Sequence, residues 1–133
     1  MNKLTIILLL VLVVIVAACA VNAVKNTGFK TVTGDEFSKL ITANSKIQLL
    51  DVRTPEEYAE GHIAGARLIN VWDSTFVEQA TAQLSKDKPV AVYCRSGKRS
   101  ATAAGKLVKQ GYEVINLDGG INAWRQQNRP VEK

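Results

Sequence analysis

The stretch Pro89–Ser100, with the sequence PVAVYCRSGKRS, decides the fold of this 133-residue chain. Its run of apolar residues, Val90–Tyr93, is typical of a parallel strand that is buried on both faces. The strand leads directly into Cys94, and an alanine-rich helix is predicted from Ser100 to Gln110. A strand, a short loop and a helix in this order indicate an α/β domain.

The same alternation of strands and helices extends in both directions from this stretch. Further strands are predicted at residues 47–52, 66–70 and 113–117, and further helices at residues 34–43, 54–60, 73–84 and 120–127. Connections of only a few residues between such elements indicate a parallel sheet with helices on both faces. We therefore predict one α/β domain over residues 24–133.

Two of these helices begin with a capping box, in which a threonine and a glutamate three residues later exchange hydrogen bonds. One box is Thr33 with Glu36, and the other is Thr54 with Glu57. In the second box Pro55 also occupies the first helical turn, where proline is favoured.

The loop after Cys94 has the composition of an anion-binding cradle. Parallel sheets bind ligands at the carboxyl ends of their strands, and the amides of a loop and of a first helical turn lack partners. Gly97 permits the curved backbone that a nest of amides requires. Such a nest stabilises a thiolate, so that Cys94 is predicted to be more acidic than a free cysteine.

The five residues after Cys94 are candidate substrate-binding residues: Arg95, Ser96, Gly97, Lys98 and Arg99. The two arginines and the lysine among them are cations that can hold a small anion. A lone cysteine at a strand end is often a buried and inert small hydrophobe. An inert thiol, however, does not need charged neighbours. Arg99 at the start of a helix is unfavourable unless an anion balances it.

Residues 1–23 are predicted to be an export signal and tether. Met1–Lys3 carries one positive charge, and every residue from Leu4 to Ala18 except Thr5 is apolar. A positive start, a short apolar run and small residues at its end are typical of a secretory signal. The run is shorter than the roughly 20 residues that span a membrane, although an uncleaved anchor is the alternative.

Cys19 follows two alanines, and this motif resembles the signal of bacterial lipoproteins. In those proteins the signal is cut before the cysteine, which then carries acyl chains that hold the protein at the membrane. We therefore expect a lipid-anchored protein of the cell envelope that faces the periplasm or the exterior. Cleavage after Ala20 or Ala23 would instead release a soluble periplasmic protein.

The composition of the domain narrows its possible partners. Removal of the signal takes only Lys3 from the 17 basic residues, and the formal net charge falls from +5 to +4. No basic run is interleaved with aromatic residues, which argues against nucleic acid. A mild positive charge suits a small anionic substrate. The sequence contains no pattern of metal ligands and no nucleotide-binding loop, so no metal or cofactor is expected; it specifies no oligomeric state.

Six segments occur together, in this order and at this spacing, in one known family. They are Leu50–Arg53, Glu57–Tyr58, Gly61–Ala66, Asn70, Cys94–Ser100 and Leu117–Trp124. On these segments the chain resembles the rhodanese homology family over nearly the whole domain. That family often has proline where this chain has Ala64. The resemblance implies a five-stranded parallel sheet with helices on both faces.

The resemblance also implies roles for residues around the loop. Cys94 would be the nucleophile that carries sulfur, and the amides of Arg95–Arg99 would form its pocket. Asp51 and Arg53 would lie near the loop and mainly brace it.

Three other residues are expected to serve mainly structural roles, and the role of a fourth stays open. Glu57 and His62 lie in segments that the family resemblance marks as structural. His62 is the only histidine, and it is therefore not expected to be catalytic. Trp72 follows the strand at 66–70 and is expected either to border the pocket or to serve the core or the surface. Trp124 lies at an apolar position of the last helix and is expected to pack.

Loop length separates two chemistries. Four residues lie between Cys94 and Arg99, whereas the related dual-specificity phosphatases and arsenate reductases have five, which gives a wider cradle for a tetrahedral oxyanion. The shorter loop fits one sulfur atom on the cysteine. The expected activity is therefore that of a thiosulfate sulfurtransferase, with a Cys94 persulfide and a thiol or cyanide acceptor. The alternatives are a sulfur-carrier or binding module for a partner protein and, with less support, an oxyanion phosphatase or reductase.

Overall fold

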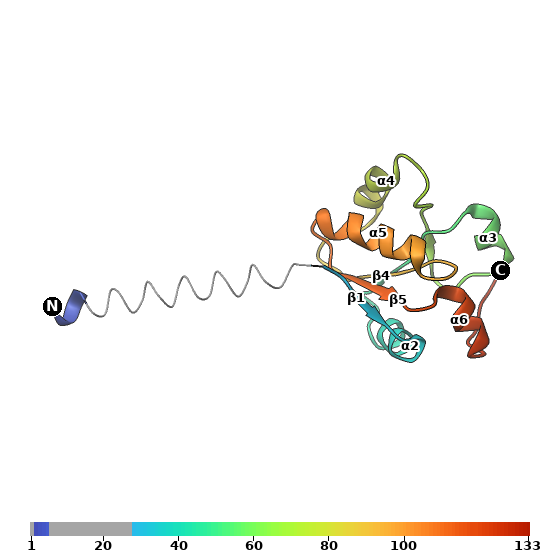
Figure 1. The fold of residues 1–133 in the computed structure, drawn as a ribbon, viewed down its shortest axis with the longest axis horizontal. Coiled ribbons are helices and arrows are strands. Elements are labelled where there is room, and N and C mark those ends of the chain that lie inside the picture. The colour runs from blue at the N-terminus through green and yellow to red at the C-terminus, as the bar shows by residue number, and fades with distance from the viewer. Residues whose placement is uncertain (1, 6–27) are drawn as a thin grey trace.

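The computed structural model describes residues 2–5 and 28–133, and the second range forms a five-stranded sheet flanked by helices (Figure 1). The elements are β1 Lys30–Val32, α2 Gly34–Ala43, β2 Gln48–Asp51, α3 Pro55–Glu60, β3 Arg67–Leu68, α4 Phe76–Gln83, β4 Val90–Tyr93, α5 Lys98–Lys109, β5 Val114–Leu117 and α6 Gly120–Gln126. The strand order is β1-β5-β4-β2-β3, and all pairs are parallel. The predicted fold class is confirmed.

The central strand β4 alternates its side chains between two apolar cores. Val90, Val92 and Cys94 face the core that is shared with α4 and α5. Ala91 and Tyr93 face the core that is shared with α2 and α6, on the other side of the sheet (Figure 1). Every residue of β4 is buried, as its continuous apolar run predicted.

The sequence pattern did not predict β1. This strand has three residues, lies at the edge of the sheet beside β5 and buries only Val32. Three residues are too few for an alternating pattern to be recognised. The strand supplies the fifth member of the sheet, which only the family resemblance implied.

Several predicted boundaries differ from the structure. The strand expected at residues 66–70 is reduced to β3, and the helix expected from Asp73 begins at Phe76 because residues 71–75 form turns and a bend. Helix α5 begins at Lys98, two residues earlier than predicted, because Gly97 adopts a left-handed conformation and starts the helix directly after the loop.

Of the two predicted capping boxes, one is complete. Thr54 and Glu57 exchange both hydrogen bonds at the start of α3. At α2 the Thr33 hydroxyl accepts from the Glu36 amide at 3.3 Å, but the Glu36 carboxylate forms an ion pair with Lys30 at 3.5 Å.

Most of the predicted signal, with Cys19 and both alternative cleavage sites, falls in residues 6–27, outside the described residues. Among the residues that the structure describes, no helix is long and apolar enough to cross a membrane.

Candidate active site

Cys94 lies at the carboxyl end of the central strand, where the chain turns into the loop before α5. Its side chain is buried, with 1% of the residue exposed. The Gly97 amide donates a hydrogen bond to Sγ at 3.0 Å. Gly97 has a φ of 110°, a left-handed conformation that favours glycine and turns its amide back toward the sulfur. The loop thus points a backbone donor at the thiol, as predicted.

The pKa of the Cys94 thiol results from two opposed effects. Burial raises the pKa because it disfavours the thiolate, whereas hydrogen bonds from Ser100 and from the amides of Gly97 and Ser96 lower it. The hydrogen bonds prevail, and the pKa lies below its ordinary value. The Ser100 hydroxyl lies 3.1 Å from the Gly97 carbonyl oxygen and can turn its single proton toward the sulfur when the thiolate forms.

The start of α6 holds the loop in this shape. The Ile121 amide donates to the Cys94 carbonyl oxygen at 2.9 Å, and the Asn122 amide donates to the Arg95 carbonyl oxygen at 3.1 Å. These bonds turn the carbonyls of the loop toward α6 and leave its amides free to face the sulfur. Gly120 makes the close approach possible, because a Cβ atom there would lie within 2.6 Å of three backbone atoms of Cys94 and Arg95.

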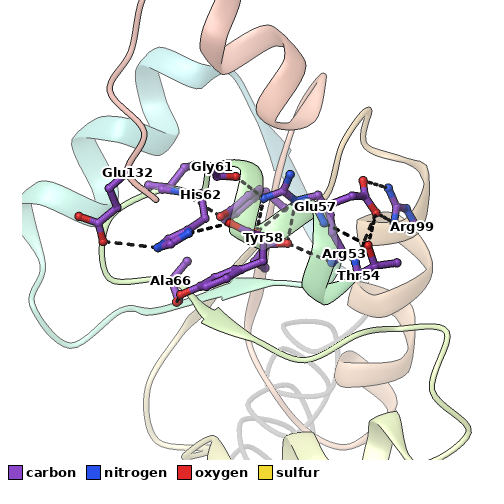
Figure 2. Close-up of polar contacts among 12 residues, drawn as sticks. Arg53, Thr54, Glu57, Tyr58, Gly61, His62, Ala66, Arg99 and Glu132 are labelled. Carbon is purple, nitrogen blue, oxygen red and sulfur yellow. Dashed lines mark hydrogen bonds and ion pairs between the residues drawn. The ribbon is translucent and has the colours of Figure 1, made fainter.

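Arg99 is held by Glu57 in a two-pronged ion pair. Its terminal nitrogens donate to the two carboxylate oxygens at 2.7 and 2.8 Å, as Figure 2 shows. The hydrogen bond from Arg99 is the main cause that lowers the pKa of Glu57 to about 2. The anion that the sequence required near Arg99 is therefore a carboxylate of the protein itself.

Trp72 covers the same guanidinium. It is exposed, and the Arg99 guanidinium carbon lies 4.5 Å from the centre of its ring. Its exposure excludes the core role that was one of the alternatives for this tryptophan and places it at the surface, beside Arg99. Trp124, in contrast, is buried, as predicted, and its indole nitrogen donates to the Pro130 carbonyl oxygen.

Asp51 and Arg53 form a buried ion pair at the end of the neighbouring strand β2. The closest contact joins Arg53 Nη2 to Asp51 Oδ2 at 2.7 Å, and the same Nη2 donates to the Gly61 carbonyl oxygen at 2.8 Å. The pair therefore ties β2 to the turn after α3 (Figure 2). These contacts agree with the bracing role that the family resemblance implied. Removing one partner of such a buried pair costs about 3–5 kcal/mol of stability.

His62 is part of a separate contact between that turn and the C-terminus. Its ring stacks on Tyr58 with 3.7 Å between centroids, Nδ1 lies 3.0 Å from the Tyr58 carbonyl oxygen, and Nε2 lies 3.5 Å from the Glu132 carboxylate (Figure 2). His62 and Glu132 also form an antiparallel backbone bridge. These contacts give the histidine the structural role that was predicted.

The other predicted site residues lie at the rim of the loop. Arg95, Ser96 and Lys98 are exposed, and Arg95 also borders a pocket of about 120 Å³ between α3 and α6. A larger pocket of about 830 Å³ lies at the opposite end of the sheet, near the amino ends of β1 and β5. Within the part of the chain that the structure describes, no three His, Cys, Asp or Glu residues are grouped closely enough to hold a metal ion.

Sequence reasoning missed three features of the site: the pairing of Arg99 with Glu57, the hydrogen bonds from Ser100 and the close contact at Gly120. The double glycine at the start of α6 was the available signal for the last feature, because adjacent glycines often mark a close backbone approach. The other two depend on contacts between distant segments or on the curvature of the loop.

Comparison with known proteins yields matches over most of the domain. The family model for the rhodanese-like domain matches residues 33–127. A sulfurtransferase of Allochromatium vinosum is 35% identical over 101 residues, which cover 75% of this chain and 92% of that protein. The thiosulfate sulfurtransferase GlpE of Stutzerimonas stutzeri is 36% identical over 100 residues and covers 74% and 87%, respectively. A rhodanese-related protein of Thermoplasma volcanium has a solved structure with a TM-score of 0.68 and 29% identity, and the match covers 78% of this chain and 98% of that one.

The close approach at Gly120 generates a testable prediction. We expect Gly120→Ala to lower the free energy of unfolding by at least about 2 kcal/mol, because the residue has a left-handed φ of 58° and its new Cβ would overlap the loop backbone. Urea denaturation measures this change. The amide resonances of residues 95–97 should shift as well, because the loop must move.

Gly105→Ala is the matched control, since Gly105 lies within α5 and a Cβ there meets nothing within 4 Å. This variant should retain its stability or gain up to about 1 kcal/mol. Equal stability of Gly120→Ala and wild type would contradict the contact between α6 and the loop.

Proposed function

This chain belongs to the rhodanese-like domain family, and on that premise we propose that it transfers sulfane sulfur through a persulfide on Cys94. The names of its relatives support sulfur transfer in general. The observation that carries the proposal is the hydrogen bond from the Gly97 amide to Sγ at 3.0 Å, in a loop whose donors lower the pKa of the thiol. Donors that stabilise a thiolate also favour negative charge on a sulfur attached to it.

In the first half-reaction, the Cys94 thiolate attacks the outer sulfur of thiosulfate. A bond forms between Sγ and that sulfur, the S–S bond of the donor breaks, and its electron pair leaves with sulfite. Cys94 then carries a terminal S⁻. Because Arg99 is paired with Glu57, the exposed Arg95 and Lys98 are the loop cations that can receive the dianionic donor.

In the second half-reaction, an acceptor thiolate or cyanide attacks the terminal sulfur. The bond to Sγ breaks, and its electron pair returns to Cys94 as the thiolate. The product is a persulfide anion or thiocyanate, and no further reductant or cofactor enters the balance. Two half-reactions through one covalent intermediate give ping-pong kinetics.

An oxyanion phosphatase or reductase has less support. The loop has four residues between Cys94 and Arg99, and both terminal nitrogens of that arginine are engaged by Glu57. A guanidinium held in this way has fewer donors left for the equatorial oxygens of a phosphate. A sulfur-carrier role would use the same persulfide and would differ only in slow turnover with every small acceptor.

The proposal is tested by the intact mass of the protein after incubation with thiosulfate. We expect one added sulfur atom per chain, and we expect cyanide to remove it as thiocyanate. Steady-state kinetics with thiosulfate and cyanide should give the parallel double-reciprocal lines of a ping-pong reaction.

Cys94→Ser is the control, because it replaces only the atom that carries the sulfur. This variant should gain no mass and show no turnover. An unchanged mass of the wild-type protein after thiosulfate would rule out thiosulfate as the donor, whereas an added sulfur in Cys94→Ser would place the modification elsewhere.

We also propose that the domain is exported and anchored to the membrane by acyl chains on Cys19. The support is the sequence, in which a positive start and an apolar run are followed by two alanines and a cysteine. Several acyl chains on one residue would give the stable anchoring that a single chain does not.

Growth with a labelled fatty acid tests this second proposal. The wild-type protein should incorporate the label and sediment with membranes, and Cys19→Ala should do neither. A labelled Cys19→Ala variant, or an unlabelled wild-type protein, would contradict lipidation at this residue.

A further inference from the structure

The pocket of about 120 Å³ beside the active-site loop shares only Arg95 with the donor-binding cations named above, and its other lining residues have no part in the two half-reactions. It lies between α3 and α6 and is lined by Arg53, Glu57, Glu60, Arg95, Ile121, Asn122 and Arg125. It adjoins the loop directly, since Arg95 follows Cys94 and the amides of Ile121 and Asn122 bind the carbonyls of those two loop residues. A cavity of this size holds several water molecules or one small head group. We call it the head-group pocket.

The charges that line the head-group pocket differ in whether they are balanced. Arg53 is paired with Asp51, and Glu57 is paired with Arg99. Within the described part of the chain, the other charged residues that line the pocket form no ion pair. These are two guanidinium groups, from Arg95 and Arg125, and one carboxylate, from Glu60.

Arg125 reaches the pocket from the face of α6 that also carries Asn122, three residues earlier. Its guanidinium lies against the backbone of Gly61, where a Cβ atom would collide with Nη2. Gly61 therefore leaves room for the arginine. The Arg53 side chain holds the carbonyl of the same glycine at 2.8 Å, so the wall beneath Arg125 is anchored to the buried ion pair of β2.

We infer that the head-group pocket binds the amino-acid head group of a small acceptor thiol, with its carboxylate on Arg95 and Arg125 and its ammonium group toward Glu60. The inference rests on the proposed function, because it concerns the acceptor of the Cys94 persulfide. Two guanidinium groups offer the paired donors that match a carboxylate. The single glutamate at the same pocket supplies the complementary charge for an ammonium group.

In the step that this pocket serves, the acceptor thiolate attacks the terminal sulfur of the persulfide. The Sγ–S bond breaks, the electron pair stays on Sγ, and the sulfur leaves on the acceptor as a persulfide anion. The carboxylate and the ammonium group do not react. Arg125 and Glu60 are therefore residues that select and position the acceptor.

Four thiols separate the two charges of the head group: cysteine has both, 3-mercaptopropionate has only the carboxylate, cysteamine has only the ammonium group, and 2-mercaptoethanol has neither. The experiment measures kcat/KM for each thiol as the sulfur acceptor from the Cys94 persulfide. Each value for a variant is divided by the wild-type value for the same thiol, so that differences in thiol acidity cancel.

For Arg125→Gln we expect kcat/KM to fall by about 10-fold with cysteine and 3-mercaptopropionate, which corresponds to the loss of one charge-assisted hydrogen bond. The values for cysteamine and 2-mercaptoethanol should stay near those of the wild type. For Glu60→Gln we expect losses only with cysteine and cysteamine. Lys106→Gln is the control, because it removes one exposed positive charge from α5, away from the pocket.

An equal loss with all four thiols, or no loss with any, would overturn the inference. Formation of the persulfide from thiosulfate should be unchanged in Arg125→Gln, because the inference assigns this arginine to the acceptor only. Failure of that step in the wild type would refute the proposed function, and it is distinguishable from a failure of the acceptor pocket. Binding of S-methylcysteine, which cannot react, tests the pocket without the persulfide. It should shift the amide resonances of Asn122 and Arg125 in the wild type, and the absence of such shifts would also contradict the inference.

Discussion

Backbone amides turned toward the Cys94 sulfur are the interaction on which the chemistry of this domain depends. The Gly97 amide reaches Sγ at 3.0 Å only because the loop is curved. The curve is maintained from outside, since the first amides of α6 bind the carbonyls of Cys94 and Arg95 and Gly120 allows the helix to approach. A thiol buried at the end of a central strand would otherwise have a raised pKa and little reactivity.

Most ionic groups around the loop hold its shape, because their charges are balanced by partners within the protein. Glu57 fixes Arg99, Asp51 fixes Arg53, and Trp72 covers the Arg99 guanidinium. An arginine that is held on both sides keeps a defined place at the edge of the loop, and its charge is largely balanced. The two exposed cations, Arg95 and Lys98, retain the capacity to attract an anionic donor. Because the two ion pairs already hold their side chains in place, the site is preorganised before the charged substrate arrives.

The sequence predicted the parts of the fold that follow from local pattern and failed where distant segments meet. The apolar run of β4, the loop and the complete capping box at Thr54 were all recognisable because neighbouring residues determine them. The edge strand β1 was not, because three residues gain their structure from β5. The sequence indicated that Arg99 needed an anion but not that Glu57, 42 positions earlier, provides it. Arg125 had no local signal, since its place beside Gly61 exists only in the folded domain.

The most direct test of this account is a titration of the Cys94 thiol, followed by the ultraviolet absorbance of the thiolate with Cys94→Ser as the blank. We expect a midpoint below that of a cysteine thiol in an unfolded chain titrated in the same way, because the donors of the loop outweigh burial. In Ser100→Ala the midpoint should rise, because one of those donors is lost. A wild-type midpoint at or above that of the unfolded chain would mean that burial prevails, and would contradict an amide cradle that stabilises sulfur anions.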